Sequence, residues 1–520
     1  IQSGGSLDVR LDPSLAATTL GALDVLQNFP HQCVEQTVSR FLPNIMTFRA
    51  LDALGLTDAD MEQSLNFSVN QALQKLVAER KVDGGWGWFV NERSNPLVTA
   101  YALIGLTEAQ AQGFAVEPTL ISGAQRFVRT ALVAANTGAS TPTLNRQAFL
   151  LYALAYSGDA DVARTSSLYE LRSRLSNYAQ ALQAMTIHLI DSTDSRAQTI
   201  LAGNAALSAT GAHWDEDFAD SWNWNTNSRS TALVLAAFMQ IDPENGLLPN
   251  VVRWLVSARA GDAWETTQET AWSVMALTDW MAASGELNPD YSYSAALNGA
   301  TLTEGTATSG SVKGTTALQV AVADMLLDQA NQLVIERGDG PGNLYYTARL
   351  NTYLPVAEIE PANQGIILER HYVLAGDDSG TPITEAQVGD TVQVRLTIIA
   401  PNDLNYAVIE DPIPAGANAI DPMLNTSQQI GTQPELNRAD PLSQGWGWWW
   451  FSRTEFRDEK VVLYATYLPA GTYEFVYSLQ IGLEGPYNVI PPTGQEFYFP
   501  EVYGRGAGSV FTVLPAAEPQ

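Results

Sequence analysis

The run FPHQCVEQTVSRFLPN, residues 29–44, contains the only cysteine in a chain of 520 residues. Gln36 follows Cys33 by three positions, and side chains at that spacing can meet within one turn. If the carboxamide carbon of Gln36 condenses with the Cys33 sulfur, ammonia leaves and an internal thioester remains. A thioester is an activated acyl group with a good thiolate leaving group, so it can pass the Gln36 acyl group to a nucleophile.

Two other interpretations of the cysteine need no thioester. Cys33 can be a small buried apolar residue, or the nucleophile of a cysteine hydrolase that pairs with a histidine. No Asn or Asp signature of such a hydrolase accompanies it. The chain contains four histidines, His31, His188, His213 and His371. We expect His188, in an apolar helical stretch, and His371, in a strand, to be structural.

The composition is that of a folded multidomain protein with a large excess of acidic residues. Apolar residues make up 46% of the chain, and the formal net charge is −29. This charge argues against nucleic acid or an anionic membrane as a partner. The sequence has no phosphate loop and no paired metal ligands, so we expect neither a metal nor another cofactor. The chain begins at Ile1 without a leader, and we interpret it as a piece of a longer precursor.

The hydrophobic period changes near residue 289. Before it, from about residue 13 to residue 287, apolar residues recur at three- and four-residue spacings, which indicates buried helices. These stretches end on glycines roughly 50 residues apart, a repeat typical of stacked helix pairs and of an α/α toroid. The glycines are Gly55, Gly113, Gly158, Gly211 and Gly285. From residue 291 onward the period falls to two, which predicts antiparallel β-sandwiches.

The leading segment SLDVRLDP, residues 6–13, also has the pattern of a strand. If it pairs with strands of residues 288–358, the helical domain is an insertion in a β-domain. The predicted domains are therefore 1–13 and 288–358 for that β-domain, 14–287 for the toroid, and 359–520 for a second sandwich. We expect the run GWGWWWF, residues 445–451, to be a strand packed on a neighbour.

The run CVEQ resembles the CxEQ thioester motif of the alpha-2-macroglobulin and complement family, and TVSRFLPN resembles its continuation in the bacterial branch. The segments at 344–355, 457–477 and 498–516 resemble the CUB and C-terminal macroglobulin-type (receptor-binding-type) domains of the family. The resemblance covers nearly the whole chain. It implies a CUB-like β-domain interrupted by a thioester domain and followed by a macroglobulin-like sandwich, the same order as the predicted domains.

The resemblance implies that the chain is the C-terminal part of a bacterial broad-spectrum endopeptidase inhibitor. A protease would cut a bait region that lies outside this sequence, and a lysine amine of the protease would then attack the acyl carbon of Gln36. Each molecule would act once, as a covalent trap and not as an enzyme. The parent protein would be exported, in the periplasm or at the cell surface, as a membrane-anchored lipoprotein. A complement-like opsonin or adhesin that forms esters, and an α/α-toroid enzyme, are the alternatives.

The resemblance also assigns roles to individual residues. Glu35 belongs to the motif, and His213 matches the acyl-transfer histidine of the hydroxyl-reactive complement members, with a locally bonded loop histidine as the alternative. Phe29, Phe497 and Tyr498 match positions that shield the thioester from water in the family, with ordinary packing as the alternative.

His31 departs from the family pattern. Bacterial relatives carry Tyr-Pro-Tyr-Gly before the cysteine, whereas this chain has Phe-Pro-His-Gln at residues 29–32. An imidazole two residues before Cys33 either tunes the thioester or is simply exposed.

Overall fold

The computed structural model describes residues 4–202, 206–208, 211–284, 287–326, 328–377, 379–421 and 451–516. Internal contacts divide the chain into two compact units, Ile1–Thr352 and Tyr353–Gln520. This division lies close to the predicted break between the two β-regions. The tryptophan-rich run predicted as a strand lies outside the described residues except for Phe451.

The first unit is mainly helical, and its helices begin where the sequence offers caps. Asn95 accepts hydrogen bonds from two N–H groups of the following turn, and proline follows it at the first helical position. Ser14, Asp58 and Ser140 cap other helices in the same way. The helices are α1 Leu15–Gln27, α2 Val34–Ala53, α3 Ala59–Glu79, α4 Pro96–Ala111, α5 Pro118–Ala131, α6 Thr141–Tyr156, α7 Val162–Tyr169, α8 Asn177–Ile190, α9 Arg196–Leu201, α10 Asn227–Ile241, α11 Leu248–Ser257 and α12 Thr267–Ser284.

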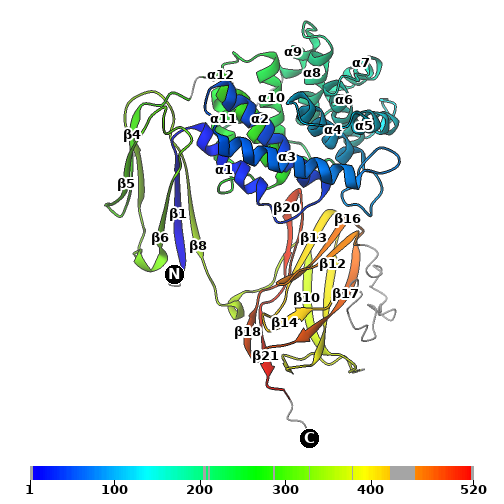
Figure 1. Cartoon of the computed structure of the whole chain (residues 1–520), viewed down its shortest axis with the longest axis vertical. Helices are drawn as coiled ribbons and strands as arrows, with labels where there is room; N and C mark the ends of the chain where they lie inside the picture. Colours follow the sequence, from blue (N-terminus) through cyan, green and yellow to red (C-terminus); the bar gives the residue numbers. More distant parts are fainter. Residues whose placement is uncertain are drawn as a thin grey trace. The chain divides into compact units, whose positions relative to one another are not determined.

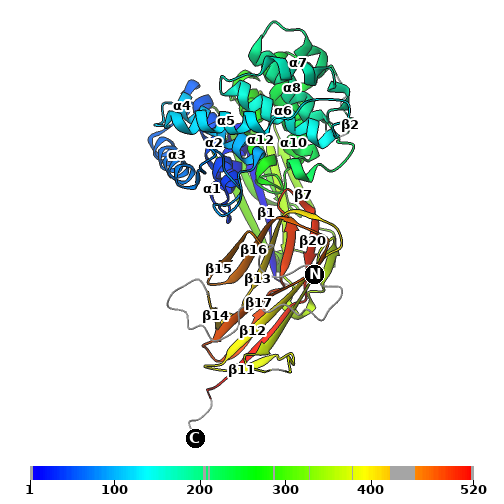
Figure 2. The same ribbon diagram turned by 90° about the vertical axis from the view of Figure 1, so that its right-hand side faces the viewer.

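The even-numbered helices form a closed inner ring. Each of α2, α4, α6, α8 and α10 packs on the next, and α12 returns to α2. The odd-numbered helices pack outside them, as α3 does on α2 and α4, and α5 does on α4 and α6 (Figures 1 and 2). Inner helices are buried nearly all round, whereas α3 and α5 each bury a single stripe. The predicted α/α toroid is confirmed.

Glycine ends three inner helices, as the repeat predicted. Gly55, Gly113 and Gly158 directly follow the caps of α2, α4 and α6 with φ of 69°, 86° and 80°, a left-handed conformation that favours glycine. Gly211 does not end a helix, so that part of the repeat was wrong. It begins the hairpin strand β3 Gly211–His213, which pairs with β2 Ala206–Ser208, and its backbone approaches Asn250 too closely for a Cβ. Gly285 lies outside the described residues.

A small β-domain completes the first unit. Its two sheets have the strand orders β6-β1-β8 and β5-β4-β7, and both contribute to one apolar core that includes Val9, Leu11 and Ala295. The strand β1 Gly5–Asp12 lies before the helices and pairs antiparallel with β6 and β8, which lie after them. The helices are therefore inserted in this β-domain. The remaining strands are β4 Tyr291–Leu297, β5 Ala300–Ala307, β6 Thr316–Ala321, β7 Leu333–Arg337 and β8 Tyr345–Thr352.

Asp12, at the end of β1, joins the β-domain to the helices. Its fully buried carboxylate accepts hydrogen bonds from Arg10 Nε at 2.9 Å, Thr315 Oγ1 at 2.8 Å and Thr18 Oγ1 on α1 at 3.2 Å. Arg259, which follows α11 and is equally buried, lies 3.6 Å away. One carboxylate thus connects the end of β1 and the start of α1 to two segments that are remote in sequence, those of Arg259 and Thr315.

The second unit is built of antiparallel sheets. Their orders are β10-β12-β17-β14, β15-β16-β13-β19-β20-β9 and β11-β21-β18, and among the strands described only β11 and β21 pair in parallel. Val392, Val394, Leu396 and Ile398 alternate inward along β12 into the core. The strands are β9 Ala362–Gln364, β10 Ile367–Leu374, β11 Glu385–Gln387, β12 Thr391–Ala400, β13 Leu404–Pro412, β14 Ala417–Ala419, β15 Arg453–Phe456, β16 Lys460–Leu468, β17 Gly471–Ile481, β18 Gly485–Val489, β19 Thr493–Glu496, β20 Phe499–Arg505 and β21 Ser509–Leu514.

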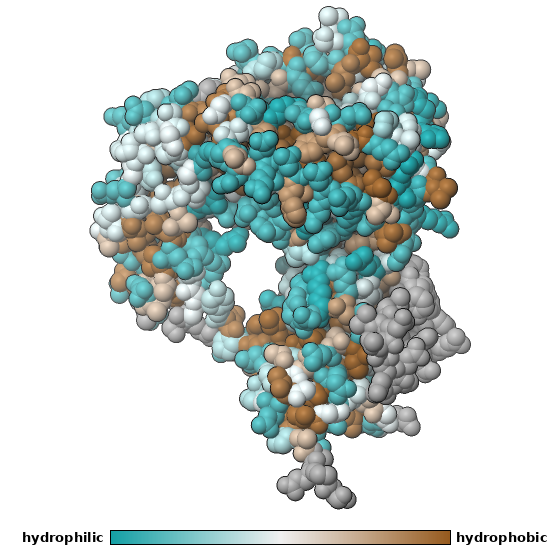
Figure 3. Space-filling model, in the orientation of Figure 1, coloured by the Kyte–Doolittle hydropathy of each residue, from teal (hydrophilic) through white to brown (hydrophobic). Residues whose placement is uncertain are grey.

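Apolar residues on the visible helical surface are interspersed with hydrophilic ones (Figure 3). The most exposed large aromatic residue among those described is Phe67 on α3. No helix in the described ranges is both long and apolar enough to cross a membrane.

Replacing Asp12 by alanine tests the connection between β1 and the helices. Asp12→Ala leaves the buried Arg259 without its counter-charge, so we expect the free energy of unfolding to fall by about 3–5 kcal/mol. Urea unfolding followed by tryptophan fluorescence measures the change. Asp262→Ala is the matched control because Asp262 pairs with the same Arg10 at 3.4 Å but is 43% exposed, and its loss should cost about 0–1 kcal/mol. Equal effects of the two substitutions would contradict the role of Asp12.

Candidate functional site

Cys33 and Gln36 meet at the N-terminus of α2, in a reciprocal pair of hydrogen bonds. The backbone N–H of Gln36 donates to Cys33 Sγ at 3.4 Å, and the N–H of Cys33 donates to Gln36 Oε1 at 3.1 Å. This is a capping box in which cysteine stands where serine or threonine is usual. Both side chains are only 1% exposed. The three-residue spacing therefore brings the thiol and the carboxamide together in a buried turn.

The two ends of the Gln36 carboxamide differ in their contacts. Its oxygen is held by the Cys33 N–H, whereas its nitrogen, Nε2, is buried and finds no hydrogen-bond partner among the described residues. A buried amide N–H₂ without a partner is unfavourable. Loss of this nitrogen as ammonia would therefore break no hydrogen bond of the site and would remove an unsatisfied group.

The Cys33 thiol lies in an environment that disfavours its ionised form. Burial raises its pKa well above the ordinary value, and the neighbouring Glu35 carboxylate raises it further, against smaller opposing effects of the Gln36 N–H and of Lys75. A neutral sulfur, whether in a thiol or in a thioester, suits this site better than a thiolate.

Glu35 fastens the start of α2 to the start of α12. Its buried carboxylate accepts from Ser39 Oγ at 2.6 Å, from Thr267 Oγ1 at 3.0 Å and from Gln268 Nε2 at 2.7 Å. Gln268 Oε1 in turn accepts from Nε of Arg229, a fully buried arginine of α10, at 3.3 Å. Burial lowers the pKa of Arg229, although the neighbouring tyrosines and acidic groups partly restore it. The motif glutamate thus reaches into a polar network shared by three inner helices.

Two cations hold the segment of residues 29–32, which leads from α1 into the capping box. Arg40 lies one helical turn after Gln36, and its Nη2 donates to the carbonyl oxygen of Phe29 and, at 3.2 Å, to that of His31. Lys75 Nζ, on α3, donates to the carbonyl oxygen of Gln32. The N–H of Val34 donates to the Trp88 carbonyl at 2.9 Å, so a third segment of the toroid fixes the same turn.

Phe29 and His31 lie beside the capping box. Their rings meet edge to face with centroids 5.7 Å apart, and His31 is 7% exposed. The expectation that His31 is simply exposed is therefore wrong. Its tuning of a thioester, and the shielding role of Phe29, stay predictions.

His213 lies in the β2–β3 hairpin and has a set of partners different from that of Cys33. Its ring stacks on Trp254 of α11 with centroids 4.4 Å apart, and its Nε2 lies 3.1 Å from Asp215 Oδ1. The hydrogen bonds of Cys33 instead involve Gln36 and Thr37 of α2. His188 lies in the last turn of α8, and His371 is an exposed residue of β10. The acyl-transfer role of His213 stays a prediction.

Phe497 and Tyr498 belong to the second unit, between β19 and β20. Both are buried, and Phe497 stacks near Tyr464 while Tyr498 meets Tyr406 edge to face. The Phe497 N–H donates to the Tyr406 carbonyl at 2.9 Å. Their packing within this unit is therefore described, and their part in shielding a thioester stays a prediction.

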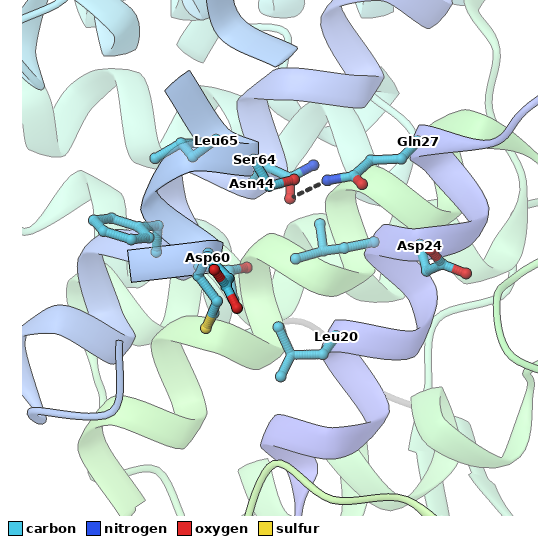
Figure 4. A pocket seen from close by; sticks show the side chains of 11 residues that line it. Leu20, Asp24, Gln27, Asn44, Asp60, Ser64 and Leu65 are labelled. Atoms are coloured by element: carbon cyan, nitrogen blue, oxygen red, sulfur yellow. Dashed lines mark hydrogen bonds between the residues drawn. The ribbon is translucent and has the colours of Figure 1, made fainter. Parts of the chain in front are cut away.

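A pocket of about 300 Å³ lies between α1, α2 and α3, and Cys33 and Gln36 do not line it. Asn44, Thr47 and Phe48 contribute from the later turns of α2, and Gln27 Nε2 of α1 donates to Asn44 Oδ1 at 3.1 Å (Figure 4). In the described ranges, no group of three or more His, Cys, Asp or Glu side chains is arranged to hold a metal ion.

Sequence analysis missed the residues that support the capping box from elsewhere in the chain. Arg40 follows Cys33 by seven positions and so shares its face of α2, which was a usable signal. Arg229, directly before an apolar helical run, was another. For Lys75 and Gln268 the sequence carried no signal, since the packing of α3 on α2 and the closure of α12 onto α2 bring these residues to the start of α2.

Comparison with known proteins matches both units to one family. The model described as "A-macroglobulin TED domain" matches residues 9–131, and the model described as "Bacterial Alpha-2-macroglobulin MG10 domain" matches residues 365–501. The alpha-2-macroglobulin homolog of Nostoc sp. is 25% identical over 97% of this chain and 26% of its own length. The alpha-2-macroglobulin of Escherichia coli is 25% identical over 94% of this chain and 29% of its own length. The chain thus spans roughly a quarter of these relatives.

Solved structures share the fold over almost the whole chain. Salmonella alpha-2-macroglobulin reacted with methylamine gives a TM-score of 0.73 at 20% identity, covering 99% of this chain and 32% of that one. Native Escherichia coli alpha-2-macroglobulin from domain MG7 to the C-terminus gives 0.71 at 19% identity, covering 98% of this chain and 78% of that one. Both domain models match the chain, and the relatives align along nearly its full length. The chain therefore belongs to the bacterial alpha-2-macroglobulin family and corresponds to the C-terminal portion of its members.

Proposed function

We propose that Cys33 and Gln36 form an internal thioester and that the chain is the part of a protease trap that binds its target covalently. The observation that carries this proposal is the buried capping box, in which the Cys33 sulfur and the Gln36 carboxamide oxygen each accept a hydrogen bond from the other residue's backbone N–H. The unpartnered Gln36 nitrogen supports it, because that nitrogen is the atom that leaves when a thioester forms.

Relatives of the chain support the proposal. Thioester-containing protein 1 of Anopheles gambiae is 22% identical over 52% of this chain. The Salmonella alpha-2-macroglobulin, which is similar in fold, was solved after reaction with methylamine. Small amines are the simplest nucleophiles for a thioester.

The proposed reaction consumes the protein. A primary amine, such as a lysine side chain of a protease, attacks the acyl carbon of Gln36, the carbon–sulfur bond breaks, and Cys33 is left as a thiol. The product is an amide between Gln36 and the target. The thioester is not regenerated, so each molecule acts once and catalyses no turnover.

Protease capture requires parts of the protein beyond this chain. Since the chain spans roughly a quarter of its relatives' length, a bait region that proteases cut would lie in the rest of the parent. We propose, from the family resemblance, that the parent is exported to the periplasm or cell surface. The proposed partners are therefore proteases, through their lysine amines.

An ester-forming role would need a base for hydroxyl groups, which are weaker nucleophiles than amines. His213 is the residue assigned to that task by position, and its observed partners are Asp215 and Trp254. No observation favours ester formation or a toroid enzyme over amine capture, and ester formation is the alternative outcome of the His213 test.

The intact mass of the chain tests the thioester. We expect the chain to be about 17 Da lighter than its sequence mass, because ammonia is lost when the thioester forms. Methylamine should abolish the deficit and expose one titratable thiol at Cys33. A native parent protein of full mass with a freely titrating thiol would contradict the proposal.

Two substitutions of Cys33 separate its chemistry from its role as a helix cap. Cys33→Ser keeps a side-chain acceptor for the Gln36 N–H, whereas Cys33→Ala removes it at a cost of about 0.5–2 kcal/mol. Both variants should lack the mass deficit and fail to bind methylamine. Thermal unfolding should show Cys33→Ser to be the more stable of the two.

His213→Asn tests nucleophile choice. If His213 acts in acyl transfer, the substitution should slow ester formation with glycerol by roughly 100-fold or more and spare amide formation with methylamine, since only the hydroxyl needs a base. Product masses over time measure both rates. His188→Asn, at the end of α8, is the control. Equal effects of His213→Asn on both nucleophiles, or none on either, would make His213 a structural residue of its hairpin and leave amine capture intact.

A further inference from the structure

One peptide group of the site is held at both of its ends. Its N–H, that of Cys33, donates to Gln36 Oε1 at 3.1 Å, and its carbonyl oxygen, that of Gln32, accepts from Lys75 Nζ. Hydrogen bonds in series polarise one another, and a charged donor strengthens the effect. The Cys33 N–H is therefore both aimed at the Gln36 oxygen and made a better donor by Lys75.

The neighbouring groups restrict this peptide further. Arg40 holds the carbonyl oxygens of Phe29 and His31, so the backbone that leads to Cys33 is fixed from the side of α2. The Cys33 carbonyl accepts from Thr37 Oγ1 at 2.8 Å. The N-terminus of α2 adds a partial positive charge at the same place. The position of the Cys33 N–H is thus fixed before any reaction begins.

We propose that the Cys33 N–H stabilises the negative charge that forms on Gln36 Oε1 during attack on the thioester, and that Lys75 is the positioning residue for this N–H. The inference rests on the proposed function. It assigns a task in the reaction to a backbone group and to a lysine on a different helix.

The chemical step shows when the donor matters. The amine nitrogen bonds to Gln36 Cδ, and the π electrons of the carbonyl move to Oε1, which becomes an oxyanion. The carbon–sulfur bond then breaks, its electron pair goes to Cys33 Sγ, and the proton lost by the nitrogen ends on the sulfur. Because the charge on Oε1 is larger in the transition state than in the resting thioester, a preset donor accelerates the step.

A purely structural role for Lys75 predicts the opposite change. If Lys75 only held the 29–32 segment in place as a cover, its removal would let amines and water in and would make the thioester react faster. If Lys75 polarises the oxyanion donor, its removal slows the reaction. The sign of the rate change therefore separates the two roles.

The test compares the whole chain with Lys75→Gln, Lys75→Arg and, as a control, Lys313→Gln. Lys313 is another partly buried lysine, paired with Asp58 at 2.8 Å, and its substitution removes the same charge away from α2. Each protein is first weighed for the thioester mass deficit and checked for folding by circular dichroism. Its second-order rate with methylamine is then measured from released thiol, and the infrared frequency of the thioester carbonyl is recorded with ¹³C-labelled glutamine.

We expect Lys75→Gln to react roughly tenfold or more slowly, somewhat less than the loss of a direct oxyanion donor, with a higher carbonyl frequency because its hydrogen bond is weaker. Lys75→Arg and Lys313→Gln should remain close to the unmodified chain. Thioester formation passes through a charge on the same oxygen, so a folded Lys75→Gln chain at full mass, with Lys75→Arg still showing the deficit, would also support the proposal.

Two results would overturn the inference alone. One is a faster or unchanged reaction of Lys75→Gln while the mass deficit persists. The other is equal behaviour of the glutamine and arginine variants. A full mass for the unmodified chain would overturn the proposed function, and the inference with it, and is read from the first measurement.

Discussion

The reciprocal hydrogen bonds between Cys33 and Gln36 are the interaction on which the rest of the site depends. A capping box normally serves only to satisfy the free N–H groups at the start of a helix. Here its two side chains are a thiol and a carboxamide, so the hydrogen bonds that begin α2 also hold the two groups of the proposed thioester in one turn. The local requirement of helix formation and the requirement of the chemistry coincide in one turn, and the helix dipole favours negative charge there.

Burial makes this turn favour a neutral sulfur over a thiolate. A thioester is uncharged, whereas its opening passes through an oxyanion and a thiolate. The site disfavours the thiolate because the sulfur is desolvated and lies near Glu35. Glu35 is itself a buried charge, which would be costly without its three donors and the arginine reached through Gln268. The polar network between α2, α10 and α12 therefore keeps a carboxylate beside the sulfur and at the same time ties inner helices together.

The β-domain holds together the two ends of the helical segment. Pairing of β1 with β6 and β8 brings the segments before and after the helices into one sheet, and Asp12 joins that sheet to α1 and to the residues after α11. Since α1 leads directly to residues 29–32, the start of the chain and the site are separated by a single helix. The second unit has its own core of alternating β residues. It also contains a buried aromatic cluster around Phe497 and Tyr498.

The sequence by itself indicated the helix–strand division and the Cys33–Gln36 pair, because each follows from a periodicity or a spacing within a few residues. It indicated the toroid through a glycine repeat of roughly 50 residues and the inserted β-domain through a strand pattern ahead of the helices. It was misleading at Gly211, where a glycine needed for close approach to Asn250 resembled a helix end, and at His31, whose burial depends on packing that no local pattern reveals. Only the tertiary structure decided which groups surround the capping box. Lys75, Gln268 and Arg229 lie 42, 235 and 196 positions from Cys33 in the numbering. Lys75 reaches its turn because α3 packs on α2, and Gln268 and Arg229 reach it because the ring of inner helices closes α12 onto α2. Long-range closure is a property of the packed helices together, so no single segment encodes it.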